Sequence, residues 1–477
     1  MDNVFRKGAW GRVALAYVVG IVILFVFMRL ELPRYVSMLQ LLILIFALDA
    51  VGFCFWRSWV RGVKSAWLRV LGYALHLLPF VLLMAFFIGL TQRNISLWPA
   101  FWRTYSLGVV LTLLSLHFVR AIVYLLWTAV YGLGRWTGAA WTDRWWAWRH
   151  KAAMGLSGLA LAVMLYGMLY GAFDLQVDRV NLHQGGRAER GLDVSGPAGL
   201  AEAERLAVAR IPTGLRGYRI VQITDFHIGS FVGTTFVEKV AQAILDLQPD
   251  MIVFTGDIVN FGSAELLPHM ATLSRLQATD GVYAVLGNHD YGDYVDWESE
   301  EAKAANRQLL KDTYAAMGWR QLDNGSLWIT RGRDSLRLVG VENWGGGYRF
   351  PKHGDLTAAL AETACAIDTA AARPDFCRAG FPHVYTVLLS HDPTHFDSIV
   401  CREAPQIDLC LSGHTHGMQL GVRLGGKDYT AAHRVYRHDA GLYTQPNGQR
   451  LYVNTGVGFN GAPFRVGIRP RIVLLEL

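Results

Sequence analysis

The sequence predicts a chain of two parts, an all-α bundle of five transmembrane helices followed by a layered α/β domain. Three observations predict this organisation. Long apolar runs are confined to the first 173 residues, which carry 16 Lys and Arg against 4 Asp and Glu, a net charge of +12, whereas the remainder has a net charge of −5. Twelve of the 16 tryptophans also lie in the first part. From Leu206 onward, short apolar segments alternate with helical stretches, which is typical of an α/β domain.

The first part contains five apolar runs, each close to the length of about 17–25 residues that crosses a hydrocarbon core of roughly 30 Å. The runs are Val13–Met28, Val36–Trp56, Val70–Leu90, Ser106–Val130 and Ala153–Phe173. The first run is followed by Arg-Leu-Glu-Leu-Pro and not by small residues, so we interpret it as a retained helix and not as a signal peptide.

The basic residues between the runs predict the orientation. Eleven of them precede the first run or lie between the second and third or the fourth and fifth, and four lie in the alternate loops. Because Lys and Arg are enriched in cytoplasmic loops, we expect a cytoplasmic N-terminus and an extracytoplasmic domain after Phe173. In a bacterium this corresponds to the inner membrane and the periplasm. The basic residues flank apolar runs and do not line a globular face, so we expect no nucleic-acid partner.

Four ionisable residues fall within the apolar runs: Asp49, His76, His117 and Arg120. Ionisable groups inside a membrane are costly and usually face a partner or a cavity. We expect Asp49 and Arg120 to pair between the second and fourth helices. Such a pair can hold the bundle in register, or it can belong to a transport or proton-relay path.

The second part begins after a polar, Gly-rich stretch, residues 174–204, which we interpret as a linker to a domain at 205–477. Expected helices are Thr235–Leu247 and Glu298–Met317. The expected strands are Tyr218–Thr224, Met251–Thr255, Val282–Leu286, Leu336–Val341, Val384–Ser390, Leu409–Ser412, Leu451–Asn454 and Arg471–Leu475.

Polar side chains collect directly after five of these strands. They form Asp225-Phe-His227, Gly256-Asp257, Gly287-Asn288-His289-Asp290, His391-Asp392 and Gly413-His414-Thr-His416. Imidazole, carboxylate and amide groups at one sheet edge can converge on metal ions, and the neighbouring glycines permit tight turns. Any one motif could be an ordinary turn, but five in order after five strands predict a metal site.

In this order the motifs resemble those of the calcineurin-like metallophosphoesterase superfamily, and more closely its membrane-attached bacterial branch. The resemblance covers about residues 205–477. It implies an α/β/β/α sandwich and a metal-dependent phosphoric ester hydrolase with two divalent ions, for which Mn, Zn and Fe suit the ligands. One ion would be held by Asp225, His227, Asp257 and His416, and the other by Asp257, Asn288, His391 and His414.

The resemblance also implies a mechanism. A hydroxide bridging the two ions would attack phosphorus in line with the leaving alkoxide. His289 would protonate that leaving group or stabilise the transition state.

Two positions depart from the family pattern. Asn260 stands where many relatives have an aspartate that orients the catalytic histidine, so His289 lacks that carboxylate and Asp290 is an alternative partner. Met418 stands where the family usually has glycine, which could narrow the path of the substrate. Trp344, beside three glycines, is a further candidate for substrate contact.

Four cysteines of the second part, Cys365, Cys377, Cys401 and Cys410, suit disulfides in an extracytoplasmic compartment. We expect the pairs Cys365–Cys377 and Cys401–Cys410. The alternative is four buried thiols.

These features predict a membrane-anchored phosphoesterase. We expect membrane lipids as partners and a phosphodiester substrate that is lipid-linked or belongs to the cell envelope, with a phosphomonoester as the other possibility. The alternative is a five-helix transporter or sensor whose outer domain binds metal without turnover. The oligomeric state is left open.

Overall fold

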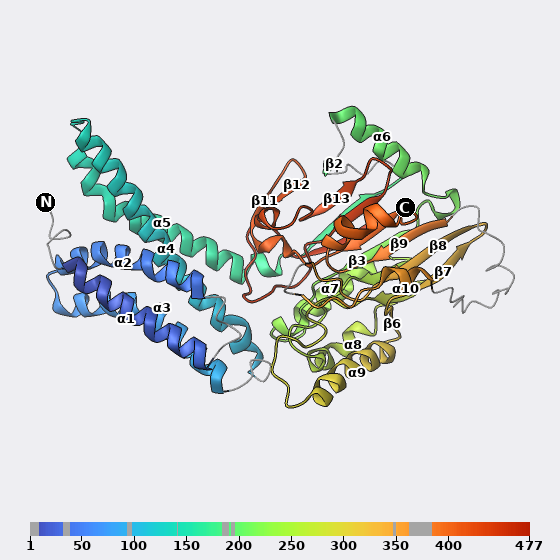
Figure 1. Cartoon of the computed structure of the whole chain (residues 1–477), viewed down its shortest axis with the longest axis horizontal. Coiled ribbons are helices and arrows are strands. Elements are labelled where there is room, and N and C mark those ends of the chain that lie inside the picture. The colour runs from blue at the N-terminus through green and yellow to red at the C-terminus, as the bar shows by residue number, and fades with distance from the viewer. Residues whose placement is uncertain are drawn as a thin grey trace. The chain divides into compact units, whose positions relative to one another are not determined.

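The computed structural model describes residues 9–31, 39–92, 98–140, 142–183, 190–191, 196–346, 350–361 and 384–477. The chain forms two compact units, Met1–Tyr166 and Gly167–Leu477. Among the described residues, the strands all lie in the second unit (Figure 1).

The first unit is a bundle of long apolar helices. Five helices are long and apolar enough to cross a membrane, by length and composition. They are α1 (Ala9–Glu31), α2 (Leu39–Arg61), α3 (Ala66–Gln92), α4 (Ala100–Trp136) and α5 (Thr142–Leu169). α2 packs against α1 and α4, and α3 packs against α4. Large apolar side chains such as Leu15, Val70 and Leu126 remain more than 60% exposed, as expected of side chains that face lipid. The five predicted helices are therefore present.

The second unit contains two large sheets. The six-stranded sheet has the order β1-β15-β3-β4-β5-β6 and the seven-stranded sheet the order β2-β13-β14-β10-β9-β8-β7. The strands β3, β4 and β5 are parallel, as are β8, β9, β10 and β14, so the loops that follow them meet at shared sheet edges. The bounds in the first sheet are β1 (Gln176–Asn181), β15 (Arg471–Glu476), β3 (Arg219–Ile223), β4 (Met251–Phe254), β5 (Val282–Ala284) and β6 (Arg320–Gln321). Those in the second are β2 (Arg190–Gly191), β13 (Gly441–Thr444), β14 (Arg450–Val453), β10 (Leu409–Ser412), β9 (Val384–Leu389), β8 (Asp334–Gly340) and β7 (Gly325–Arg331).

Alternating side chains assign each face of a strand to a different layer. In β3, Ile220 packs in the core between the two sheets, together with Val387 and Leu409 of the second sheet. Its neighbour Val221 points the other way and packs with residues of the helices α7 (Thr235–Asp246) and α9 (Glu300–Ala316). On the outer side of the second sheet, Leu388 packs with the Phe396 turn. The predicted α/β/β/α order of layers is confirmed.

The predicted linker at 174–204 is wrong where the structure describes it. Gln176–Asn181 forms the edge strand β1, parallel to Arg471–Glu476, and Gly196–Ala209 forms the helix α6. The polar sequence of β1 is accommodated by pairing: Asp178 Oδ2 lies 3.1 Å from Arg471 Nε. Composition alone therefore mistook a paired edge strand for a linker.

The predicted disulfide between Cys401 and Cys410 is also wrong, since both are free thiols. Cys410 is buried in the central strand β10, with its Sγ 3.8 Å from Ser412 Oγ. The Cys401 thiol belongs to the short helix α11 (Cys401–Glu403) and donates to the carbonyl oxygen of Asp397 at 3.5 Å. The strand and the helical turn thus give the two thiols different partners. Cys365 and Cys377 lie outside the described residues, and their pairing stays a prediction.

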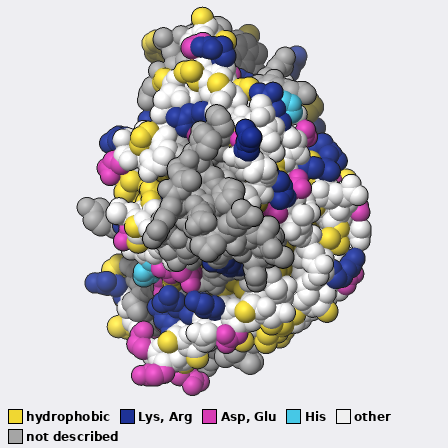
Figure 2. Space-filling model, turned by 90° about the vertical axis from the view of Figure 1, so that its right-hand side faces the viewer, with side chains coloured by type: hydrophobic (Ala, Val, Ile, Leu, Met, Phe, Trp, Pro, Cys, Tyr) yellow, Lys and Arg dark blue, Asp and Glu magenta, His cyan; other side chains and the backbone are white. Residues whose placement is uncertain are grey.

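The outer surface of the second unit carries both signs of charge. On the side viewed in Figure 2, Lys and Arg side chains are mixed with Asp and Glu side chains among apolar and uncharged polar groups. The described surface on that side is thus of the ordinary mixed kind that faces water.

Candidate metal centre

The five polar motifs follow strands of both sheets and converge in space. Asp225 and His227 follow β3, Asp257 follows β4, and Asn288 with His289 follows β5. His391 follows β9, and His414 and His416 follow β10. All are buried except His414, which is half-buried. The two sheets therefore bring seven potential ligands together in the interior of the second unit.

The first group of ligands consists of Asp225, His227 and His416, whose donor atoms lie within 4.8 Å of one another. His227 Nε2 lies 3.0 Å from His416 Nε2, which lies 3.3 Å from Asp225 Oδ1. Donor atoms around a cation with bonds of about 2.1 Å are separated by distances of this size. The group is thus arranged as the ligands of one ion.

The second group consists of Asp257, His391 and His414. His391 Nε2 lies 3.2 Å from His414 Nδ1 and 3.2 Å from Asp257 Oδ2. The same Asp257 oxygen lies 3.7 Å from His227 Nε2 of the first group. The Asp257 carboxylate therefore lies between the two groups, where it could bind a cation on each side.

Asn288 supplies an independent sign that the pocket fits a cation. Its amide nitrogen donates to the hydroxyl of Tyr294 at 2.7 Å, which fixes the orientation of the amide. Among the described residues, its buried Oδ1 has no hydrogen-bond partner. A buried amide oxygen without a donor is costly, and a metal ion would satisfy it.

The backbone at the site is strained. Five site residues have positive φ: Asp225 (48°), His227 (44°), Asp257 (55°), His414 (72°) and His416 (49°). Such left-handed conformations are uncommon for residues with a Cβ, and they cluster at functional sites. The strain turns successive side chains toward one point.

Neighbouring groups fix the directions of the ligands. The Asp225 carboxylate accepts from Thr224 Oγ1 at 2.8 Å and from the backbone N–H of His414 at 2.9 Å. His391 donates from Nδ1 to the carbonyl oxygen of Thr255 at 2.8 Å, which leaves its Nε2 directed into the site. A side chain at Gly256, whose φ is 101°, would meet His391 Nδ1 at 2.6 Å, so this position requires glycine.

Burial keeps two of the imidazoles neutral. It lowers the pKa of His227 to about 3 and the pKa of His414 to about 4. A neutral imidazole has the lone pair that binds a metal ion. These side chains are therefore in the ligating form at neutral pH.

His289 lies beside the ligands and is held at both ring nitrogens. Its Nδ1 donates to the carbonyl oxygen of Asn260 at 2.8 Å, and its Nε2 accepts from Asn460 Nδ2 at 3.2 Å. Its ring stacks on Tyr294 with 4.1 Å between centroids. The Asn260 side chain donates to Ser230 Oγ instead. The missing aspartate is thus replaced by a backbone carbonyl, which orients His289 without a carboxylate.

Asp290 does not contact His289 but binds the backbone of two ligand loops. Its Oδ2 accepts from the N–H groups of Asp257 and Gly287, both at 2.8 Å. Its Oδ1 accepts from those of Ile258 at 3.0 Å and Val259 at 3.3 Å. This fully buried carboxylate therefore holds the loop of Asp257 against the loop of Asn288.

The two candidates for substrate contact differ in position. Trp344 is buried, stacks on His395 and is covered by Lys352, whose Nζ lies 4.0 Å from the ring centroid. Met418 is 46% exposed, two residues beyond His416. Met418 is thus accessible to a substrate, whereas Trp344 is packed between His395 and Lys352.

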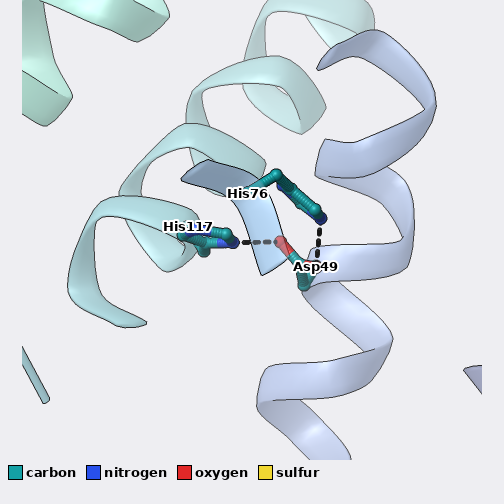
Figure 3. Close-up of side chains that lie close together, drawn as sticks. All are labelled: Asp49, His76 and His117. Atoms are coloured by element: carbon teal, nitrogen blue, oxygen red, sulfur yellow. Dashed lines mark hydrogen bonds and ion pairs between the residues drawn. The ribbon is translucent and has the colours of Figure 1, made fainter. Parts of the chain in front are cut away.

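The first unit contains a separate polar cluster around Asp49 (Figure 3). Arg120 Nη2 lies 3.7 Å from Asp49 Oδ1, and both histidines point at the same carboxylate, with His117 Nδ1 at 2.8 Å and His76 Nε2 at 3.2 Å. Tyr17 donates its hydroxyl to Asp49. The expected pair thus lies within a cluster that joins α1 to α4.

Three contacts could not be predicted from the sequence. Asn460 meets His289 across 171 residues, Tyr294 orients Asn288, and Tyr17 joins the Asp49 cluster from another helix. The sequence offers no motif for these residues. The one available signal was the polar stretch around Asn460, within the C-terminal tail that already resembles the family.

Comparison with known proteins agrees with this geometry. The family model for calcineurin-like phosphoesterases matches residues 218–418. A transmembrane protein with metallophosphoesterase domain from Danio rerio is 28% identical over 57% of this chain and 56% of its own length. An uncharacterized metallophosphoesterase from Aquifex aeolicus is 30% identical over 58% of this chain and 90% of its own. The UDP-2,3-diacylglucosamine pyrophosphatase LpxG from Chlamydia trachomatis is 30% identical over 51% and 79%.

The chain spans little more than half the length of the animal relatives it matches. It covers nine-tenths of the Aquifex aeolicus protein, and residues 218–418, which match the family model, contain the ligand loops described above. The chain belongs to the calcineurin-like metallophosphoesterase family.

Proposed function

We propose that this membrane protein hydrolyses a phosphoester with two divalent cations. One cation would be held by Asp225, His227, Asp257 and His416, and the other by Asp257, Asn288, His391 and His414. The observation that carries the proposal is the position of Asp257 Oδ2, which lies 3.7 Å from His227 Nε2 and 3.2 Å from His391 Nε2. A carboxylate between two sets of imidazoles suits a dinuclear centre.

Bound cations would polarise the phosphoryl group and lower the pKa of a water ligand. Asp257 would partly neutralise their charge. When protonated at both ring nitrogens, with Nε2–H directed to the substrate in place of Asn460, His289 would donate a proton to the leaving oxygen from Nε2, because its Nδ1–H is already engaged by the carbonyl of Asn260. Four imidazoles among the ligands favour Mn, Fe or Zn over Mg, which prefers oxygen ligands.

We further propose that the substrate is a phosphodiester or a related ester carried by a lipid. Five helices that are long and apolar enough to cross a membrane would keep the site near a bilayer. A relative that is named a UDP-2,3-diacylglucosamine pyrophosphatase acts, by that name, on an acylated compound, which supports a lipid-linked substrate here. The excess of basic residues in alternate loops supports a site outside the cytoplasm, in a bacterial inner membrane.

The proposal is tested by measuring the hydrolysis of soluble phosphoesters. Purified full-length protein is assayed on bis-p-nitrophenyl phosphate and p-nitrophenyl phosphate with added Mn²⁺ and after chelation. We expect turnover that requires metal and that Asp257→Asn abolishes, with the diester cleaved faster. The matched control is Asp323→Asn, the same chemical change at a surface pair with Lys311, which should retain full activity.

The alternative, a transporter or sensor, is favoured by one observation, the buried Asp49 cluster in the helical unit. It predicts that the protein binds two cations per chain and hydrolyses neither soluble esters nor esters from a membrane-lipid extract. Such a result would contradict the phosphoesterase proposal.

A further inference from the structure

A small hairpin follows the last two ligands along the chain. The strands β11 (Gly421–Leu424) and β12 (Lys427–Thr430) pair antiparallel, with Val422 opposite Tyr429 and Arg423 opposite Asp428. The turn is Gly425-Gly426, and both glycines have positive φ, as a tight two-residue turn requires. The hairpin begins five residues after His416.

The two faces of this hairpin are opposite to those expected in water. The charged residues share the other face: Asp428 is buried and accepts from Arg471 Nη1 at 2.5 Å, and Arg423, which is itself partly exposed, has its Nη1 3.1 Å from Asp178 Oδ2. The apolar face points outward. Val422 is 45%, Leu424 60% and Tyr429 50% exposed. A two-stranded hairpin normally directs its apolar face to the core, so this face is suited to an apolar environment outside the protein.

The hairpin is joined to the end of the fifth candidate membrane span. The backbone N–H of Gly421 donates to Val466 at 2.9 Å, and the next-door Arg465 donates its N–H to the carbonyl of Gly167 at 3.2 Å. Gly167 lies in the last turn of α5 and packs so closely that a Cβ there would lie 2.7 Å from Val466 Cγ2. The candidate span continues to Phe173.

Side chains around this junction suit a bilayer surface. Leu169 and Tyr170, at the end of the helix, are 66% and 56% exposed. Exposed Lys427 lies opposite Leu424 in the hairpin, where an ammonium group could meet lipid phosphates. Apolar side chains flanked by a tyrosine and a basic residue are typical of groups that lie at the membrane interface.

We propose that the outward face of the hairpin, formed by Val422, Leu424 and Tyr429, inserts into the surface of the phospholipid bilayer that α5 crosses. Because His416 leads through exposed Met418 directly to this hairpin, the contact holds the metal centre at the lipid surface. A lipid-linked phosphoester would then reach the site without leaving the bilayer, a consequence that rests on the proposed function.

Photocrosslinking tests the contact without relying on catalysis. A benzophenone amino acid is placed at Leu424, at Val422 or, as a control, at Lys311 of α9. Figure 1 shows the helix α9 on another side of the unit from β11 and β12. The full chain is reconstituted in vesicles of phosphatidylethanolamine and phosphatidylglycerol, irradiated and analysed by mass spectrometry. Unchanged elution and metal content establish that each variant is folded.

We expect lipid adducts at Leu424 and Val422 several-fold above those at Lys311. Equal adducts at all three positions, or adducts to protein in place of lipid, would overturn the proposal. If lipid adducts form but no phosphoester is cleaved, the lipid contact stands and the phosphoesterase proposal fails.

A kinetic comparison provides a second readout. In the double variant Val422→Ser, Leu424→Ser we expect KM for a vesicle-bound lipid phosphoester to rise about tenfold, because the lost apolar area weakens interfacial binding. The kcat/KM for soluble bis-p-nitrophenyl phosphate should stay unchanged. An unchanged KM for the vesicle-bound ester would contradict the contact.

Discussion

Replacing Asp290 by asparagine should loosen the metal centre although no metal ligand is replaced. The Asp290 carboxylate accepts four backbone N–H groups, two on each oxygen, from the loops that carry Asp257 and Asn288. In Asp290→Asn, one oxygen becomes an NH₂ group that faces two N–H donors. Two buried hydrogen bonds are lost, and two N–H groups are left without an acceptor.

The magnitude follows from those two groups. Each buried N–H left unpaired costs about 1–3 kcal/mol, so Asp290→Asn should reduce the free energy of unfolding by about 2–6 kcal/mol. For the unit Gly167–Leu477, of 311 residues, an unfolding entropy of about 2.1 cal/mol/K per residue lowers Tm by about 1.5 °C per kcal/mol, which places the expected shift at about 3–9 °C. The affinity for metal should fall as well, because Asp257 and Asn288 lie on the loosened loops.

The assay is thermal unfolding of the detergent-solubilised full chain, at one scan rate, with excess Mn²⁺ and after chelation. Asp323→Asn makes the same chemical change at a surface ion pair and should shift Tm by at most about 2 °C, since exposed pairs contribute about 0–1 kcal/mol. If Asp290→Asn and Asp323→Asn unfold at the same Tm, Asp290 is not the group that joins the ligand loops.

Two further predictions concern other buried groups. Asp49→Asn removes the charge that faces Arg120 and should lower the free energy of unfolding of the helical unit by about 3–5 kcal/mol. The protein in detergent should therefore lose its activity faster on heating. Equal rates of loss in the variant and the wild type would contradict a stabilising role of the contacts around Asp49. Burial lowers the pKa of His395 to about 4, so an unfolded chain binds its proton below about pH 6.5 and the folded chain does so only near pH 4. Stability should therefore fall by about 3 kcal/mol as the pH drops from 6.5 to 4, and urea titrations of His395→Gln should show a shallower loss over this window; the same slope in both proteins would refute it.

The strands and the polar residues at their ends could be predicted because both depend on local patterns, whereas the α/β/β/α order of layers was implied by the family resemblance. Each ligand follows directly on a buried apolar strand, so the strand and its polar end could be found together, as in Ile252-Val253-Phe254 before Asp257. The membrane helices were equally plain, since their apolar runs are long and uninterrupted. The helices α1, α3 and α4 extend past the predicted runs at both ends, because a helix can continue beyond the hydrocarbon core, whereas α5 ends at Leu169, before the predicted end at Phe173.

Elements whose character is set by a distant partner were not predicted. β1 looks like a linker until Asp178 is placed beside Arg471, and Asp428 of the hairpin is buried where it pairs with the same Arg471. The free Cys410 thiol packs in a sheet core that spacing along the chain does not reveal. In each case the deciding contact joins residues far apart in the sequence.

The number of metal ions bound per chain tests the dinuclear centre most directly. Full-length protein is saturated with Mn²⁺ or Zn²⁺, freed of excess metal by dialysis and measured by inductively coupled plasma mass spectrometry, with Asp257→Asn and Asp323→Asn treated alike. We predict two ions per chain in the wild type and in Asp323→Asn, and fewer in Asp257→Asn, because the shared carboxylate is lost. One ion or none in the wild type, or two ions in Asp257→Asn, would contradict a dinuclear centre built on Asp257.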